Sequence, residues 1–230
     1  SGTRAVRRRI LQTLFPLLLT LPWRANFKQM ARWSRRNEGT IHNWFGSALE
    51  LIDFQRSLID KHGSGEHCTL FDPSYLPKSG KSTPGLGRYW SGQAGAVKRG
   101  LEIGAFAVGD LGHHTAFHLS ASMTPSQAEL KAEGKTLMKH YVSLVAERRA
   151  DILHFGRFLA VDGYFGVTTF VNPVTQMGIE VISCLKSNSS LYYAPPRQNG
   201  KKGRGRPRVK GDKVNWSKVD ETALPLVMED

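Results

Sequence analysis

The sequence predicts a mixed α/β sheet flanked by helices and preceded by a small helical domain. Three observations lead to this fold class. Apolar residues recur at helical spacing in residues 1–62. Residues 66–188 alternate short apolar runs with helical stretches, which is typical of helices layered on a sheet. Residues 189–230 are polar, glycine- and proline-rich and very basic. We therefore expect three domains with these boundaries.

The composition indicates a polyanionic partner. The 230 residues include 32 Lys and Arg against 19 Asp and Glu, a formal net charge of +13. Such an excess favours nucleic acid or an anionic membrane surface. The apolar run over residues 10–21 follows three arginines like a targeting signal, but it is too short to span a bilayer and contains Pro16. We interpret it as a buried helix or turn and expect no membrane association, with secretion as the alternative.

Cysteine usage bears on the compartment. Cys68 and Cys184 are the two cysteines of the chain, too few for a disulfide framework. A reducing, cytoplasmic location fits best.

Two short helices joined by a tight, basic turn are predicted near the N-terminus. Asn26 is a good N-cap for a first helix over residues 27–33, and helical spacing resumes at Thr40. This pattern indicates a helix-turn-helix, whereas an ordinary helical hairpin with a solvated basic face is the alternative. The residues expected to contact DNA in this part are Arg35, Arg36, His42, Asn43 and Ser47.

Five apolar strands are predicted in the middle of the chain. They cover residues 68–71, 100–111, 115–121, 158–161 and 180–185. The first should end at Pro73, because proline has no N–H to donate to a ladder. The second and third form an antiparallel hairpin, and Leu101 and Ile103 share one apolar face of the second.

Two helices separate the later strands. Thr124, Pro125 and Gln127 predict the start of one, with Thr124 as N-cap and Gln127 completing a capping box, and it should continue to about Asp151. The other covers residues 167–177 and stops at Gly178.

Asp72 and Asp162 are the candidate catalytic residues because each follows a short apolar strand. Ligands of open α/β sheets bind at the carboxyl ends of strands. If the two strands are neighbours, both carboxylates converge, and a divalent cation relieves their repulsion. Oxygen ligands favour Mg²⁺ or Mn²⁺. The alternative is that each Asp caps the turn or helix that follows it.

Other polar groups are weaker candidates. Asp110 also ends an apolar strand, but at a hairpin turn, where Asp is common. His113, His114 and His118 do not have a recognised zinc spacing, so we interpret them as surface or groove residues. Residues 80–87 form a glycine-containing basic loop without a phosphate-loop pattern.

Two separated motifs carry a resemblance to a known family. Residues 70–81, LFDPSYLPKSGK, with 85–92, GLGRYWSG, resemble the first catalytic block of bacterial insertion-sequence transposases of the DDE class. Residues 159–165, LAVDGYF, resemble the block around the second catalytic aspartate, and residues 115–119, TAFHL, also fit. The resemblance covers about residues 25–215.

The resemblance implies an RNase H-like core and Mg²⁺-dependent cleavage and strand transfer on double-stranded DNA, both transposon ends and target. Asp72 and Asp162 would hold two metal ions. It further implies a homodimer in a synaptic complex and a bacterial, nucleoid-associated location. Lys78, Lys81 and Arg88, in and beside the basic loop, are expected to contact the DNA.

The family pattern also needs a helical glutamate, for which this sequence offers few candidates. Glu221 and Glu229 lie in a sparse tail, and Glu180 starts a strand. We therefore expect that the third acid is missing and that the chain is an N-terminal portion, inactive alone.

The basic tail is a second DNA-contacting candidate. An Arg-Gly-Arg-Pro segment, resembling an AT-hook, is slim enough for the minor groove. A solvated linker that binds phosphates nonspecifically is the alternative. The residues expected to contact DNA are Arg204, Arg206 and Arg208, with Tyr192, Tyr193 and Trp216 packing or stacking nearby.

Two other functions remain open for the same sequence. One is a non-catalytic DNA-binding regulator derived from a transposase. The other is a different RNase H-like nuclease, acting on RNA or on repair intermediates.

Overall fold

A computed structural model describes residues 2–22, 25–46, 51–80, 82–185, 190–193, 195, 209–215 and 217–218, with the backbone alone for 2–7. Contacts group the chain into two compact units. One comprises Ser1–His67 and Ala105–Ala121, and the other comprises Cys68–Gly104 and Ser122–Asp230. None of the described helices combines the length and the apolar character needed to cross a membrane.

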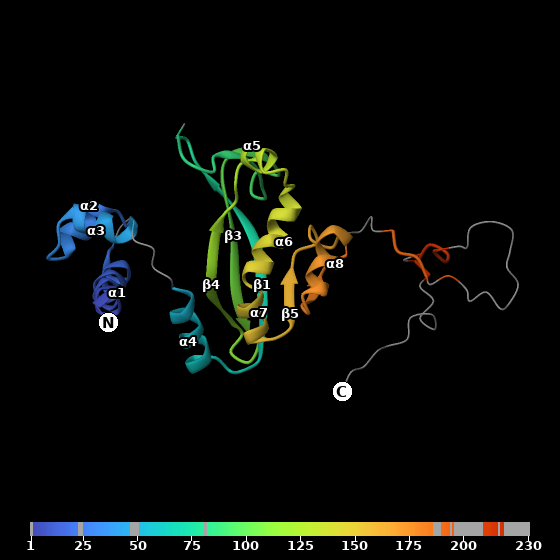
Figure 1. Ribbon diagram of the computed structural model, residues 1–230, viewed down its shortest axis with the longest axis horizontal. Helices are drawn as coiled ribbons and strands as arrows, with labels where there is room; N and C mark the ends of the chain where they lie inside the picture. The colour runs from blue at the N-terminus through green and yellow to red at the C-terminus, as the bar shows by residue number, and fades with distance from the viewer. Residues whose placement is uncertain are drawn as a thin grey trace, which may run out of the picture. The chain divides into compact units, whose positions relative to one another are not determined.

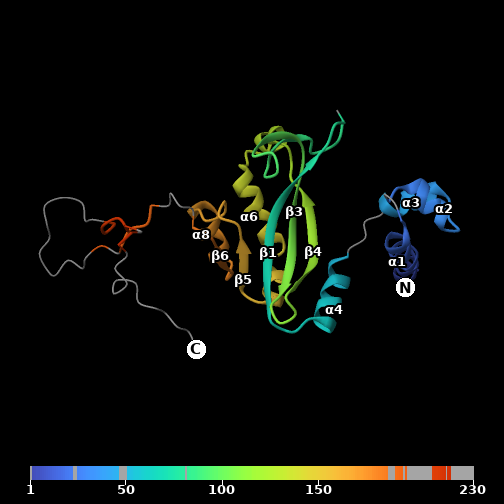
Figure 2. The same cartoon turned by 180° about the vertical axis from the view of Figure 1, so that it is seen from behind.

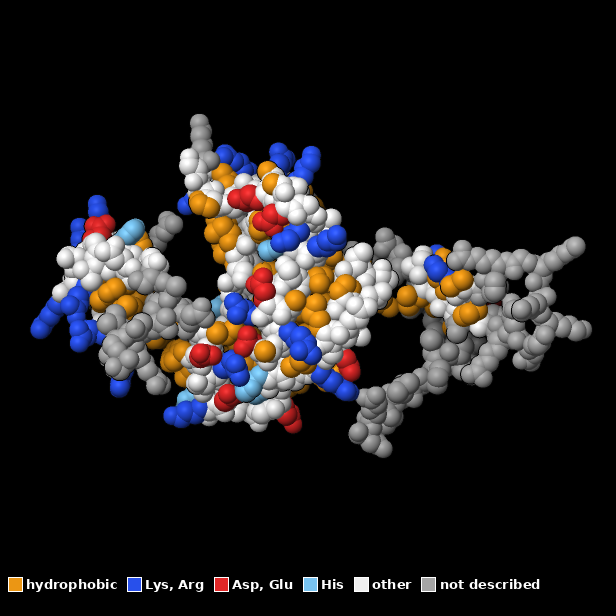
Figure 3. Space-filling model, in the orientation of Figure 1, with side chains coloured by type: hydrophobic (Ala, Val, Ile, Leu, Met, Phe, Trp, Pro, Cys, Tyr) orange, Lys and Arg blue, Asp and Glu red, His pale blue; other side chains and the backbone are white. Residues whose placement is uncertain are grey.

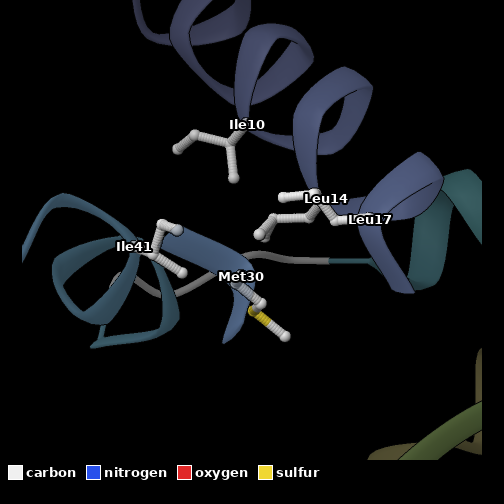
Figure 4. Packing of buried hydrophobic residues seen from close by; sticks show 5 residues of the cluster. All are labelled: Ile10, Leu14, Leu17, Met30 and Ile41. Atoms are coloured by element: carbon white, nitrogen blue, oxygen red, sulfur yellow. The ribbon is translucent and has the colours of Figure 1, made fainter. Parts of the chain in front are cut away.

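The N-terminal part is helical, as expected. Its helices are α1 (Gly2–Thr20), α2 (Phe27–Trp33), α3 (Glu38–Gly46) and α4 (Ile52–His62). The apolar run over residues 10–21 lies almost entirely within α1, which continues through Pro16. The first three helices share one small core. As Figure 4 shows, it contains Ile10, Leu14 and Leu17 of α1, Met30 of α2 and Ile41 of α3.

Side-chain caps begin both short helices. The backbone N–H of Gln29 donates to Asn26 Oδ1 at 3.0 Å, which confirms Asn26 as the N-cap of α2. The N–H of Thr40 donates to Asn37 Oδ1 at 2.7 Å. Helix α3 therefore begins at Glu38, two residues before the expected start, because Asn37 is the capping residue that the sequence analysis missed.

The described strands form one mixed sheet, which confirms the expected α/β class. Its strands are β1 (His67–Pro77), β2 (Gly87–Ser91), β3 (Ala96–Asp110), β4 (Thr115–Met123), β5 (Phe158–Val161) and β6 (Glu180–Ser183). The order is β2-β3-β1-β5-β6, with β4 paired to β3. Figure 2 shows β4, β3, β1, β5 and β6 in succession across the sheet. Strand β5 runs parallel to both β1 and β6, whereas β2 and β3 are antiparallel.

Strand β1 does not end at Pro73, so that prediction was wrong. It continues to Pro77, although its pairing with β5 ends at Phe71. Beyond Phe71, β1 has β3 as its neighbour on one side, whereas on the other side its register with β5 has ended. A missing N–H is tolerated at such an open edge, and this explains why proline is accommodated here.

Strand β2 was missed because its sequence is short and lies next to a glycine-rich loop. Its register partners in β3 run from Gly87–Gly100 to Ser91–Ala96, so β3 also begins earlier than expected. The buried side chains of β3 include Glu102, on the face opposite the half-buried Leu101 and Ile103. The alternation of the two faces of β3 was therefore predicted correctly, but the sequence did not show that the face with Glu102 is the more buried one.

The predicted helix over residues 124–151 is divided into three. The helices after β4 are α5 (Gln127–Ala132), α6 (Leu137–Glu147), α7 (Arg149–Phe155) and α8 (Thr168–Gln176). The capping box of α5 is formed by Ser126 and Glu129, so Thr124 is not the N-cap. Gly134 adopts a φ of +64°, a left-handed conformation that suits glycine and separates α5 from α6.

Aromatic packing joins β1 to the helices. The Phe71 ring lies 5.8 Å from the Tyr141 ring of α6 and 5.5 Å from the ring of Phe165. Phe165 in turn lies 4.7 Å from Phe170 of α8. Helices α6 and α8 lie on one face of β1 and β5, which Figure 1 views from the helix side and Figure 2 from the strand side. Asp72, which follows Phe71 in β1, and Asp162, which follows β5, therefore lie next to a packed core.

Candidate active site

The parallel pairing of β1 and β5 brings Asp72 and Asp162 together. Phe71 and Val161 are register partners, and each aspartate is the next residue along the chain. This convergence was expected if the two strands were neighbours, and they are neighbours.

Backbone and hydroxyl groups fix the position of Asp162. Its Oδ1 accepts the backbone N–H of Tyr164 at 2.9 Å. Its carbonyl oxygen accepts the N–H of Phe165 at 3.1 Å and the hydroxyl of Ser183, on β6, at 2.7 Å. The turn-capping role foreseen as the alternative is therefore present in Asp162. The hydrogen bond from Tyr164 uses Oδ1 of Asp162, so Oδ2 remains available as a metal ligand.

Asp72 makes fewer hydrogen bonds than Asp162, and the charge of Asp162 affects its pKa. Its Oδ2 accepts the hydroxyl of Ser74 at 3.3 Å. Although Asp72 reaches water at the cleft surface, partial burial raises its pKa. The Ser74 hydrogen bond lowers this pKa and the negative charge of Asp162 raises it further. The two carboxylates thus repel each other, and a cation between them would relieve that repulsion.

The donor set fits a hard divalent cation. Two adjacent carboxylates supply oxygen ligands, which Mg²⁺ and Mn²⁺ prefer. Across the part of the chain that is described, no group of three or more His, Cys, Asp or Glu is placed to hold a metal. Of the candidates for a third acid, Glu180 lies at the start of β6 and pairs with Arg157 at 3.3 Å. Glu221 and Glu229 lie outside the described residues.

Two clefts meet at the aspartates, and both have Asp72 and Asp162 in their walls. The more polar cleft, of about 600 Å³, runs past Ser74 and the β2–β3 turn to Lys98. The more apolar cleft, of about 480 Å³, is lined by residues of β2, β3, α5 and α6. Trp90 of β2 belongs to both clefts.

A buried carboxylate, Glu102, lies in the wall of the apolar cleft and was not found from the sequence. It is 6% exposed and accepts a hydrogen bond from the Tyr141 hydroxyl at 2.5 Å. Burial raises the pKa of Tyr141, and the Glu102 hydrogen bond adds to the increase. Burial and then the Glu102 charge raise the pKa of Tyr89 to about 12. The sequence shows a glutamate that alternates with the apolar residues of β3, but only the packing of α6 against it shows that Glu102 is buried.

Some of the expected DNA-contacting residues lie on the helices and others beside the clefts. Arg35 and Arg36 are exposed between α2 and α3, with the Arg36 guanidinium 5.7 Å from the centre of the Trp44 ring. His42 is exposed and its ring meets Phe27 edge-on at 5.1 Å, and Asn43 is exposed next to it.

Of the candidates outside the helices, Lys78 follows β1 and Arg88 lies on β2, where it lines the apolar cleft. Figure 3 shows Lys and Arg side chains gathered near α5, at the end of the unit that contains Cys68–Gly104. The remaining candidates, Ser47, Lys81, Arg204, Arg206, Arg208 and Trp216, lie outside the described residues.

Asp110 forms a separate buried cluster. It accepts hydrogen bonds from the Ser64 hydroxyl at 2.5 Å, the Ser64 N–H at 2.8 Å and the His113 N–H at 2.9 Å. The His113 ring lies 3.1 Å from its Oδ2 and that of His67 lies 3.8 Å away. Burial raises the pKa of Asp110, but the hydrogen bonds outweigh it and hold the pKa well below its usual range. Asp110 therefore closes the hairpin turn, as expected, and also binds the segment after α4.

Comparison with known proteins gives the family. Residues 2–228 match the family described as DDE superfamily endonuclease, and the chain belongs to this family. Neither a curated protein nor a solved structure shows significant similarity to the chain. The six-stranded mixed sheet with flanking helices is consistent with the RNase H-like fold expected for a DDE protein. Membership supports nuclease or transposase activity on DNA.

Proposed function

We propose that the protein is a transposase of a bacterial insertion sequence that binds transposon ends and catalyses Mg²⁺- or Mn²⁺-dependent DNA cleavage and strand transfer. The observation that carries this proposal is the register of β1 and β5, which aligns Asp72 and Asp162 at the mouth of two clefts. The family match supports the reaction class.

Asp72 and Asp162 would hold the cation through their carboxylate oxygens. Bound there, Mg²⁺ or Mn²⁺ supplies Lewis-acid chemistry to phosphoryl transfer. Ser183 and the N–H of Tyr164 orient Asp162, while Ser74 orients Asp72. These contacts limit the motion of both carboxylates, and this matters because a displacement of about 1 Å can cost about 100-fold in rate.

Basic and polar side chains would hold the DNA. Arg35, Arg36, His42 and Asn43 would contact one stretch of duplex, and Lys78 and Arg88 would contact the strand that enters the clefts. The net charge of +13 favours such binding. Two copies would act together in a synaptic complex, each holding one transposon end.

A second candidate function is a DNA-binding regulator that does not cut. It is favoured by the finding that the described residues bring two carboxylates together but no third metal-ligating group. Such a protein would occupy the same DNA ends and compete with an active transposase.

Plasmid nicking in Mg²⁺ separates these functions. A missing third acid predicts no nicking by the protein alone, so nicking by the wild-type protein would show that the chain does supply this acid. Such nicking should be lost with Asp72→Asn or Asp162→Asn and retained with Asp53→Asn, which changes an exposed acid at the start of α4. Nicking that survives in both site variants would contradict the proposal. DNA binding without nicking would favour the regulator, and cleavage restricted to RNA–DNA hybrids would favour another RNase H-like nuclease.

A further inference from the structure

Two arginines face each other across the antiparallel ribbon of β2 and β3. Arg88 of β2 and Arg99 of β3 are register partners, and both are exposed. Side chains of directly opposite residues stand on the same face of a sheet, with Cβ atoms about 5 Å apart. Because a guanidinium group does not lose its charge in proteins, two positive charges stand side by side on this ribbon.

No acid neutralises this arginine pair within the part of the chain that is described. Neither Arg88 nor Arg99 forms an ion pair there. Like charges directly opposite each other destabilise an antiparallel pair. An anion bound between the two guanidinium groups would relieve this repulsion.

The surroundings of Arg99 hold it in place and add a further positive charge. The Tyr75 hydroxyl, on β1, donates to the Arg99 carbonyl oxygen at 2.7 Å. The Arg99 guanidinium donates to the Gly80 carbonyl oxygen at 3.3 Å, and a guanidinium has further N–H groups for a ligand. Lys78 approaches the same glycine, because a Cβ on Gly80 would lie 3.8 Å from its Cε.

The arginine pair lies close to the candidate active site. Trp90 stands two residues after Arg88 on the same face, and it lines both clefts that contain Asp72 and Asp162. Two residues of a strand span about 7 Å, which is about the length of two nucleotides along a DNA strand. A DNA strand that enters the clefts would therefore pass the arginine pair.

We propose that Arg88 and Arg99 together bind one backbone phosphate of the DNA, about two nucleotides from the strand held at the clefts. Both guanidinium groups donate to the phosphate oxygens, which their planar, forked geometry suits. The phosphate charge offsets the repulsion between the arginines, so DNA binding also stabilises the ribbon. The inference rests on the proposed function, because it names a contact that holds the DNA beside the two aspartates.

The first test measures binding of a short DNA duplex by fluorescence anisotropy at several salt concentrations, without divalent metal. Arg88→Gln and Arg99→Gln should each reduce the slope of log K against log salt. The double variant should reduce it by about 0.9 in total, the contribution of one shared phosphate. Arg149→Gln is the matched control and should keep the slope. Arg149 is an exposed arginine on α7 that also donates to a backbone carbonyl, that of Met177 at 2.7 Å.

The second test measures thermal unfolding without DNA, to establish that the two side chains face each other. Arg99→Glu places an acid opposite Arg88, so this variant should unfold at a temperature about 1–4 °C higher than Arg99→Gln does. In an Arg88→Gln background the difference should disappear. Equal unfolding temperatures of the two variants, or a difference that persists in that background, would overturn the phosphate site.

The outcomes of the binding test separate this inference from the proposed function. Slopes that do not change in either variant would overturn the phosphate site even if Asp72 and Asp162 bind Mn²⁺. A reduction of about 1.8 in the double variant would assign the two arginines to separate phosphates and would also overturn it. Arginine-dependent slopes in a protein whose aspartates bind no metal would instead contradict the cleavage function and keep the phosphate site.

A further arm distinguishes a DNA phosphate from free phosphate. Chloride is replaced by inorganic phosphate at constant ionic strength, and DNA binding of wild type is compared with that of the double variant. We expect wild type to keep its higher affinity, because the DNA is also held by other contacts. If inorganic phosphate removes the difference between the two proteins, the arginine pair is a site for free phosphate, and its assignment to the DNA is overturned.

Discussion

Phe71 and Val161 are register partners in the parallel pair β1–β5, and Asp72 and Asp162 follow them side by side. Phe71 is also packed against Tyr141 and Phe165. The position of the carboxylates therefore depends on the core as well as on the strands. Substitutions in that core should affect both stability and the site.

Tyr141→Phe should destabilise the protein by about 1–3 kcal/mol. The change removes the hydroxyl that donates to the buried Glu102, and a buried acceptor without its donor is costly. Urea denaturation measures the difference. Tyr75→Phe is the control, because the Tyr75 hydroxyl also donates a hydrogen bond, to Arg99 O, but at an exposed position. An equal effect of the two changes would contradict the importance of burial.

Leu14→Ala should destabilise the N-terminal helices by about 2–5 kcal/mol. Leu14 is buried in the core of α1, α2 and α3, and truncation leaves a cavity there. On the same helix Leu19 is 86% exposed, so Leu19→Ala should change stability by about 0.5 kcal/mol or less. Helix loss followed by circular dichroism in urea compares the two. Similar midpoints for both variants would show that this core does not hold the helices.

Asp110 should make stability depend on pH in acid. Its folded pKa lies below the unfolded value of about 3.9, so its stabilisation is present above that value and is lost as the pH falls toward the folded pKa. The gap in free energy of unfolding between wild type and Asp110→Asn should therefore narrow below about pH 4.

Urea denaturation at several pH values checks this expectation. His67 and His113 are the titratable groups that face the Asp110 carboxylate. Ser64→Ala removes a donor to Asp110 and should destabilise the protein at neutral pH. Ser57→Ala, an exposed serine on α4, should not. A gap that stays constant from pH 7 to pH 3 would contradict this account.

DNA affinity should fall steeply with salt, and Arg35→Ala should reduce the slope of log K against log salt by about 0.9. Each phosphate contact releases counterions, and Arg35 is an exposed residue between α2 and α3. Arg157→Ala is the control, because Arg157 is paired with Glu180. Fluorescence anisotropy at several salt concentrations gives the slopes. The same slope for wild type and Arg35→Ala would place Arg35 away from the phosphates.

The sequence predicted the sheet and the two aspartates because those features are local. Short apolar runs ending in aspartate mark β5 and the paired part of β1, and Asn26 marks the start of α2. Their convergence required only that the two strands be neighbours. The family resemblance pointed to the same two residues, and the match over residues 2–228 supports it.

Features that depend on distant partners could not be predicted. Pro73 continues a strand because β5 no longer pairs beside it, and no local pattern reports that. Glu102 is buried because Tyr141, 39 residues later, covers it. Similarly, Ser64 binds Asp110 across 46 residues. In each case the partner, and not the residue itself, determines the environment.

Divalent-cation binding tests the central claim most directly, because it requires neither the correct DNA end nor turnover. Isothermal titration with Mn²⁺ should show a site in the wild-type protein that Asp72→Asn and Asp162→Asn each weaken by about tenfold or more. Asp53→Asn should leave the affinity unchanged. If both site variants bind Mn²⁺ as tightly as wild type does, Asp72 and Asp162 do not form the metal site, and the proposed cleavage mechanism fails.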